Sequence, residues 1–193
     1  MCFFCTFAAL KKTQTMSFFV SEQMTTPPAQ FETETQQHIY ETLQQLEIPF
    51  RRVDTDDGST MEDCVFISEG LQCPVVKTIF VCNRQQTKFY LYVTTGEKPF
   101  VTKEFCGALN IPRVSFAPGE MLWEKLGTRI GATTILGLIN DPEHLITLVI
   151  DKEVADRDEY ACTDGTNNCF MKFSIRDLFD KYLMHTGHQA III

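Results

Sequence analysis

Two apolar runs with a short polar segment between them constrain the fold of this chain more than any other feature. Residues 75–82 and 88–94 are rich in β-branched and aromatic residues, which are enriched in strands. The segment that separates them, residues 83–87, is entirely polar. The two runs therefore predict a hairpin within a sheet.

Helices and further strands are expected around this hairpin. Thr33 and Gln36 fit a capping box, and Ile39, Leu43 and Leu46 follow at helical spacing. Patterns of these kinds predict helices over 35–47, 61–69 (ended by Gly70), 101–109, 119–126 and from Ser174 to Gly187, and strands over 50–54, 135–139, 145–150 and 169–173. Strand pairs mixed with helices indicate an α+β (mixed α/β) fold, with a central mixed sheet flanked by helices.

The length fits one domain and a tail. The chain has 193 residues, of which 44% are hydrophobic. Residues 1–30 begin with an apolar stretch that lacks the basic start of a signal peptide and is shorter than the roughly 20 residues of a membrane span. We expect a disordered extension or a start-site artefact over 1–30, with weak membrane contact as the alternative, and a folded domain over 31–193.

Charge and cysteine content narrow the class of protein. A net charge of −8 argues against a general DNA or RNA binder, but it allows a local basic pocket for one RNA end. The eight cysteines follow no secretory signal, which favours a reducing, cytoplasmic compartment over a disulfide framework. No later segment has the length and apolarity of a membrane span, and the oligomeric state is left open.

A run of small residues is the first candidate binding feature. Gly131, Ala132, Thr133 and Thr134 carry little side-chain bulk and precede an apolar run that ends at Asp141. A ligand or another backbone can approach such a main chain closely. The run suggests the floor of a small pocket, and a purely structural turn is about as plausible.

Lys77 is the second candidate, because its neighbours Val75, Val76, Ile79 and Phe80 predict a largely buried strand. A strand lysine is usually a solvated surface residue. A lone lysine on an apolar strand instead suggests a cleft, where its charge would contact a ligand.

The order of these segments resembles the YbaK-like, prolyl-tRNA editing family of aminoacyl-tRNA deacylases over roughly residues 35–193. Members of the family usually carry Lys-Asn on the first central strand, and here Lys77 matches the lysine while Thr78 replaces the asparagine. Gly131 matches a family glycine, and Ile135 occupies the position of a family proline.

A third stretch also carries the resemblance. The family has a His-Pro pair four residues before an asparagine; here Thr163 and Asp164 replace the pair, and Asn167 matches the asparagine. The resemblance thus implies Lys77, Gly131 and Thr163 as catalytic residues. The implied substrate-binding residues are Thr78, Ala132, Thr133, Thr134, Ile135 and Asn167.

The implied reaction is hydrolysis of the ester that joins an amino acid to the acceptor end of tRNA. Such a reaction depends on positioning and oxyanion stabilisation rather than on a nucleophilic triad. The alternative is a catalytically silent module that uses the same cleft to bind an aminoacyl end, an amino acid or a protein. A thiol-dependent hydrolase ranks last, because no Cys–His pair has a suggestive spacing.

We expect neither a cofactor nor a metal. No Walker A loop and no GxGxxG sequence is present to hold nucleotide phosphates. Cys2 and Cys5 have the spacing of half a zinc site, but no second pair completes it. His185 and His188 lie at the C-terminal end of a predicted helix, where their charge would complement the helix dipole.

Overall fold

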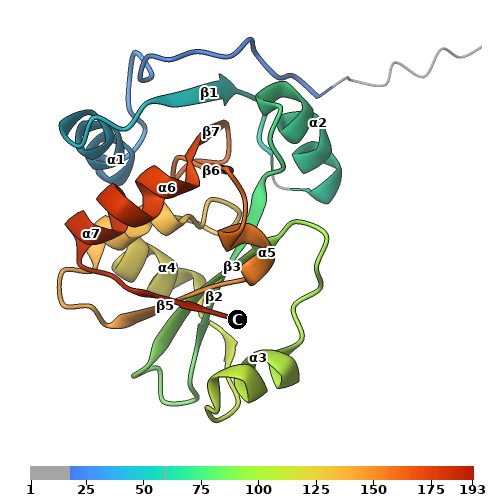
Figure 1. The fold of residues 1–193 in the computed structure, drawn as a ribbon, viewed down its shortest axis with the longest axis vertical. Coiled ribbons are helices and arrows are strands. Elements are labelled where there is room, and N and C mark those ends of the chain that lie inside the picture. The colour runs from blue at the N-terminus through green and yellow to red at the C-terminus, as the bar shows by residue number, and fades with distance from the viewer. Residues whose placement is uncertain (1–17, 59) are drawn as a thin grey trace, which may run out of the picture.

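The computed structural model describes residues 18–58 and 60–193 and contains two sheets surrounded by helices (Figure 1). The helices are α1 (Glu34–Gln45), α2 (Met61–Leu71), α3 (Thr102–Leu109), α4 (Gly119–Leu126), η1 (Ile135–Asn140), α5 (Lys152–Ala155), α6 (Ile175–Asp177), η2 (Leu178–Tyr182) and α7 (Leu183–Thr186). The strands are β1 (Phe50–Asp54), β2 (Val76–Cys82), β3 (Phe89–Thr95), β4 (Ser115–Phe116), β5 (Ile146–Ile150), β6 (Glu159–Thr163), β7 (Cys169–Ser174) and β8 (Ala190–Ile192).

The larger sheet is mixed and has the strand order β4-β2-β3-β5-β8. Strands β2 and β3 pair antiparallel, which confirms the predicted hairpin, whereas β3–β5 and β5–β8 are parallel pairs. The smaller sheet, β1-β7-β6, is antiparallel. A parallel bridge between Val75 and Ala161 joins the two sheets at the start of β2. The α+β fold with a mixed sheet flanked by helices is confirmed.

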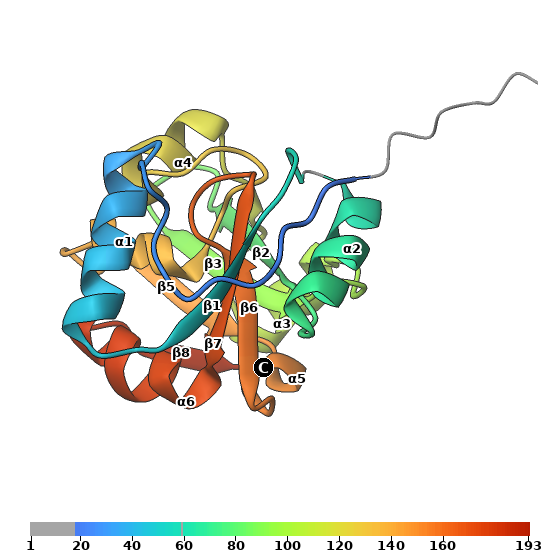
Figure 2. The ribbon, with the colours of Figure 1, turned by 90° about the horizontal axis from the view of Figure 1, so that it is seen from above.

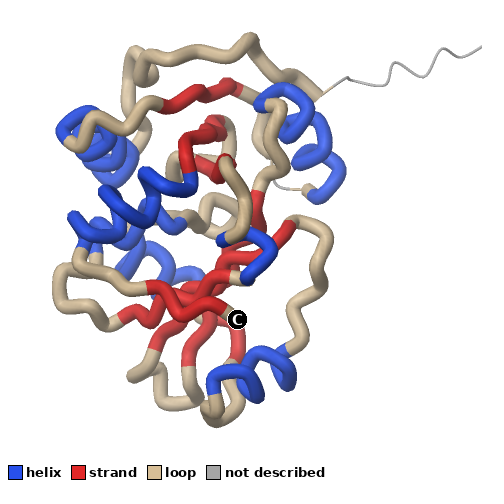
Figure 3. Tube along the Cα trace, in the orientation of Figure 1, coloured by secondary structure: helices blue, strands red, loops and turns tan. Residues whose placement is uncertain are grey.

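The two faces of the larger sheet bury different sets of side chains. Leu91 and Val93 face the main core beneath α1, α4, η1 and the α6–α7 segment. Tyr90 and Tyr92 point to the opposite face, where they pack with Phe105 of α3. This alternation is the period of two expected of a strand buried on both faces. Figure 3 shows α3 apart from the other helices, at the far side of this sheet.

The smaller sheet is also covered on both faces. Seen from above, α1 and α2 lie on either side of β1, β7 and β6 (Figure 2). Tyr40 of α1 belongs to the main core with Phe173, whereas Ile67 of α2 packs with Val53 and Phe170.

Most predicted elements are present within a few residues of their expected bounds, but the strand over 135–139 is wrong. That segment is the 3₁₀-helix η1, which the Thr134 hydroxyl caps by accepting from the Leu136 amide at 3.3 Å. Gly70 lies inside α2, and the left-handed residue that ends this helix is Gln72. The structure adds β4, β6, β8 and α5, which the sequence did not lead us to predict.

Part of the stretch assigned to a disordered extension lies along β1. Val20 bridges to Thr55 and Met24 to Arg52, and Val20 packs against the α2 cluster. Residues 1–17, which include Cys2 and Cys5, and residue 59 lie outside the described residues. The predicted domain boundary at residue 31 is not tested by these contacts and stays a prediction. In the described part of the chain, no helix has the length and apolarity needed to cross a bilayer.

Candidate functional site

A cleft of about 220 Å³ opens where the two sheets meet, and we call it the inner cleft. It is lined by Gly58, Thr60, Cys64, Val75, Val76, Lys77, Thr78, Gly96, Gly131, Thr133, Cys162, Thr163 and Phe170. Strand β4 pairs with Val81 and Cys82 of β2, and β6 meets the start of β2 at the Val75–Ala161 bridge. Among the described strands, Lys77 and Thr78 therefore have ladder partners only on β3, and they line the inner cleft together with Cys162 and Thr163 of β6.

Lys77 is half-buried in the inner cleft, and its ammonium group is held by a main-chain group. Its Nζ donates to the carbonyl oxygen of Lys98 at 2.8 Å. An ammonium group has three protons, so one hydrogen bond orients Lys77 and leaves donors for a ligand. The expectation that Lys77 lies in a cleft agrees with this placement.

A buried carboxylate fixes the loop that holds Lys77. Asp151 is 2% exposed, and its Oδ2 accepts from the Lys98 ammonium at 2.7 Å, the Thr94 hydroxyl at 2.9 Å and the Tyr92 hydroxyl at 3.0 Å. Burial raises the pKa of Asp151, but hydrogen bonds from Lys98, the Glu153 amide, Thr94 and Tyr92 outweigh it and hold the pKa below its usual value. The carboxylate therefore stays charged and anchors Lys98.

Gly131 also lines the inner cleft. Its φ of +90° is accessible to glycine and strained for other residues. A β-carbon at this position would lie 3.0 Å from Oδ1 of Asn167. The Ala132 amide donates to the Arg129 carbonyl, whereas no described residue accepts from the amides of Gly131 and Thr133. Those two amides thus have no acceptor in the described part of the chain, and both residues line the inner cleft.

The hydroxyl of Thr163 is committed to the turn between β6 and β7. It donates to the carbonyl oxygen of Thr166 and accepts from the Gly165 amide at 3.1 Å. The fully buried Asp164 holds the same turn by accepting from Gln36 at 2.8 Å and Tyr40 at 3.0 Å. Thr163 thus contributes mainly to the shape of the inner cleft, because its hydroxyl proton is already donated to the Thr166 carbonyl.

The thiols in the inner cleft are not nucleophiles at neutral pH. Burial raises the pKa of the Cys162 thiol to about 12, and burial together with Asp63 raises the pKa of Cys64. The thiolate is the reactive form of cysteine. This result agrees with the low rank of a thiol-dependent hydrolase in the sequence analysis.

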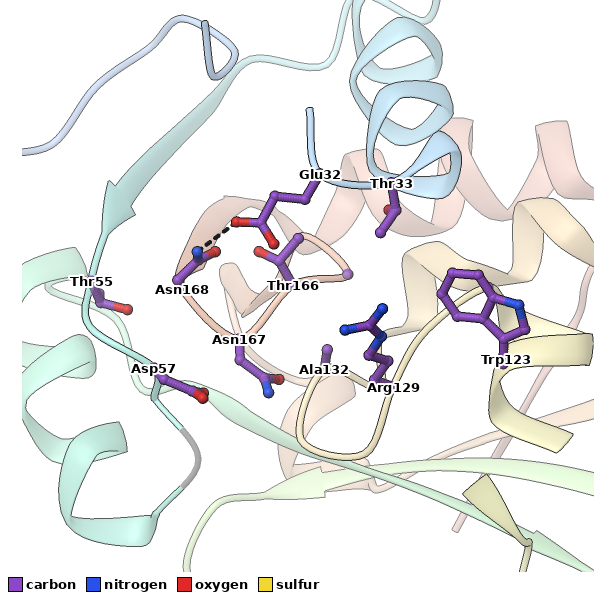
Figure 4. Close-up of a pocket in the computed structure, with 12 residues that line it drawn as sticks. Glu32, Thr33, Thr55, Asp57, Trp123, Arg129, Ala132, Thr166, Asn167 and Asn168 are labelled. Carbon is purple, nitrogen blue, oxygen red and sulfur yellow. Dashed lines mark hydrogen bonds between the residues drawn. The ribbon is translucent and has the colours of Figure 1, made fainter. Parts of the chain in front are cut away.

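A second cleft of about 420 Å³ adjoins the first, and we call it the outer cleft (Figure 4). It is lined by Glu32, Thr33, Thr55, Asp57, Trp123, Gly127, Arg129, Ala132, Gly165, Thr166, Asn167 and Asn168. Glu32 accepts from the Asn168 amide nitrogen at 2.6 Å, and the Arg129 guanidinium lies 5.7 Å from the ring centroid of Trp123. The side-chain oxygen of Asn167 is buried and has no partner among the described residues.

The structure brings most of the predicted site residues to these two clefts. Lys77, Thr78, Gly131, Thr133 and Thr163 line the inner cleft, and Ala132 and Asn167 line the outer one. Thr134 and Ile135 line neither cleft, because both are fully buried at the start of η1.

Sequence reasoning missed Arg129, Trp123 and Cys162. A signal for Trp123 was available: Leu122 and Leu126 occupy the core positions of α4, so the intervening tryptophan falls outside the apolar stripe. Cys162 lies on β6, a strand that was not predicted.

Comparison with known proteins agrees with this architecture. The family model of the aminoacyl-tRNA editing domain matches residues 55–181. The prolyl-tRNA synthetase associated domain-containing protein 1 of Danio rerio is 26% identical over 157 residues, which cover 80% of this chain and 84% of that protein. The prolyl-tRNA editing protein ProX of Acetoanaerobium sticklandii is 24% identical over 142 residues, 74% of this chain and 87% of the relative.

The fold is shared with solved structures. One of them, described as a candidate trans-editing enzyme for prolyl-tRNA synthetase, superposes with a TM-score of 0.60 at 14% identity. The match covers 84% of this chain and 98% of that structure. Because the family model matches about two thirds of the chain, residues 55–181, the chain belongs to the aminoacyl-tRNA editing domain family.

Proposed function

We propose that this protein is a cytoplasmic aminoacyl-tRNA deacylase that hydrolyses mischarged tRNA in trans, as the names of its relatives suggest for them. The observation that carries the proposal is the inner cleft itself. The Lys77 ammonium group and a turn with two amides that lack a described acceptor, at Gly131 and Thr133, line the same cleft in a member of the editing-domain family.

These groups suit hydrolysis of an activated ester by water. The negative charge that develops on the carbonyl oxygen would be stabilised by the Lys77 ammonium and by the amides of the Gly131 turn. Those donors are already oriented, so little reorganisation is needed in the transition state. At about 220 Å³ the inner cleft is smaller than the roughly 300–1,000 Å³ of typical ligand pockets, which favours a small amino acid.

The test is deacylation of a panel of aminoacyl-tRNAs, including alanyl-tRNA with the proline acceptor. We expect hydrolysis of at least one small mischarged species. Lys77→Ala should lower kcat by about 10²–10³-fold, the typical cost of removing one oxyanion donor. Lys152→Ala is the matched control, because Lys152 is 70% exposed and pairs only with Asp156 among the described residues. Absence of hydrolysis across the panel would overturn the proposal.

A catalytically silent binding module is the second candidate, and the side chains of the inner cleft favour it. Among the described lining residues none carries an imidazole or a carboxylate, and both thiols are protonated. The described lining of the inner cleft therefore offers no side chain suited to act as a general base. Saturable binding of aminoacyl-tRNA with no hydrolysis, lost in Lys77→Ala, would establish this function; unchanged affinity in Lys77→Ala would exclude the inner cleft as its site.

A further inference from the structure

We propose that the outer cleft binds an unpaired nucleotide at the 3′ end of an RNA, with its base stacked at Trp123 and its phosphate next to Arg129. The inference rests on the proposed function, since it identifies where the RNA part of the same substrate lies. It concerns residues that contribute nothing to the inner cleft.

The exposure of Trp123 points to a ligand rather than to packing. The side chain is 52% exposed, although the neighbouring Leu122 and Leu126 of the same helix are buried in the core. Figure 4 shows its ring at the rim of the outer cleft, with Arg129 between it and Asn167. An accessible aromatic face beside an arginine is the combination with which proteins hold single-stranded nucleic acid.

The other lining residues select a nucleotide over a polyphosphate or an apolar ligand. Arg129 is the one cation among the described lining residues, and Glu32 and Asp57 supply carboxylates. Such a set would repel a chain of phosphates. It suits one phosphate next to a neutral ring whose exocyclic amines and ribose hydroxyls need acceptors.

The connection between the clefts gives the RNA a direction. Gly131 and Thr133 line the inner cleft, and Ala132 between them lines the outer one. Likewise, Asp57 lines the outer cleft and the next residue, Gly58, lines the inner one. A nucleotide in the outer cleft would therefore present its terminal ribose ester to Lys77 across one turn. The volume of about 420 Å³ lies within the roughly 300–1,000 Å³ typical of small-molecule sites.

Trp123 allows a direct test, because it is the only tryptophan in the chain. An RNA tetranucleotide that ends in CCA and carries no amino acid should quench tryptophan emission saturably. The same RNA with an abasic 3′ end should quench it much less. Anisotropy of a labelled tetranucleotide then gives the Kd of variants without tryptophan. Trp123→Ala should weaken binding about 5- to 150-fold, the range of one base–aromatic stack, and Trp123→Phe by less.

Control variants and a kinetic readout separate this inference from the proposed function. Met184→Ala, at an exposed apolar side chain on α7 that lines neither cleft, should leave the Kd unchanged. On aminoacyl-tRNA, Trp123→Ala should raise KM and preserve kcat. Equal affinity of wild type and Trp123→Ala for the tetranucleotide would overturn the inference whether or not the protein hydrolyses aminoacyl-tRNA. Quenching without hydrolysis would instead overturn the deacylase proposal alone.

Discussion

At the scale of single residues, Asp151 connects the stability of the fold to the inner cleft. Its carboxylate binds the Lys98 side chain, and the Lys98 carbonyl accepts from Lys77. Thr94 and Tyr92 donate to the same oxygen from β3, so the loop at Lys98 is tied to the larger sheet. The position of the Lys77 ammonium therefore depends on a carboxylate that lies outside the inner cleft.

Asp151→Asn should destabilise the protein by about 2–3 kcal/mol near neutral pH, because charged hydrogen bonds in a buried site are lost. The folded pKa of Asp151 is lowered, so its contribution is fully present above the unfolded value of about 3.9 and is lost as the pH falls through the folded value. The stability difference between wild type and variant should therefore shrink below about pH 4. Denaturant unfolding across the pH range measures it.

Glu153→Gln is the matched control for this prediction. Glu153 also contacts the Lys98 ammonium, at 3.3 Å, but it is 66% exposed. An exposed pair of this kind contributes about 0–1 kcal/mol. A loss of stability in Glu153→Gln equal to that in Asp151→Asn would contradict the role given to the buried carboxylate.

At the scale of elements, η1 shows how tertiary contacts decide a conformation that the sequence leaves open. The run 135–139 is short, apolar and rich in isoleucine, and periodicity does not distinguish a buried strand from a buried helix at that length. In the structure the Leu136 carbonyl accepts from the Tyr182 hydroxyl at 2.5 Å, and Asn140 donates to the Leu126 carbonyl at 2.9 Å. These partners come from distant segments of the chain, so they could not be read from the run itself.

Gly137→Ala tests the close packing between η1 and α4. An added β-carbon would lie 2.9 Å from the Leu126 carbonyl oxygen and 3.2 Å from the Leu126 β-carbon. The Leu126 backbone cannot move away easily, so we expect the variant to lose about 1–3 kcal/mol of unfolding free energy. Thermal unfolding measures the change.

Gly107→Ala in α3 supplies the comparison, because nothing lies within 4 Å of the added β-carbon. Alanine there should stabilise the protein by about 0.5–1 kcal/mol. If both variants unfold at the wild-type temperature, the packing of η1 against α4 is looser than the structure shows.

The parts predicted from sequence are those with local causes. The β2–β3 hairpin follows from two apolar runs and a polar loop, and Lys77 was placed in a cleft from its apolar neighbours. Strand β6 was missed because it begins at a charged residue, Glu159, and its apolar positions become recognisable only once β7 pairs with it. Arg129 reaches the outer cleft through the fold alone, since no local pattern marks it.

At the scale of the whole molecule, net charge limits how the protein can bind RNA. The chain carries a charge of −8, so a broad attraction to the tRNA backbone is not expected. Among the described residues that line the two clefts, the cations are Lys77 and Arg129. Binding should therefore depend on a few local contacts at the acceptor end rather than on many phosphates.

This charge distribution predicts a shallow salt dependence of RNA binding. With one or two phosphate contacts, log K should fall with log[KCl] with a slope between about −0.7 and −1.4, because each contact in a single strand contributes about −0.7. Arg129→Gln should make the slope less negative by about 0.7. Titrations of the CCA tetranucleotide and of intact tRNA at several KCl concentrations, followed by Trp123 emission or by anisotropy for variants, give both slopes. A slope for intact tRNA steeper than about −4 would correspond to about six phosphate contacts, and it would show that a surface beyond the two clefts engages the RNA.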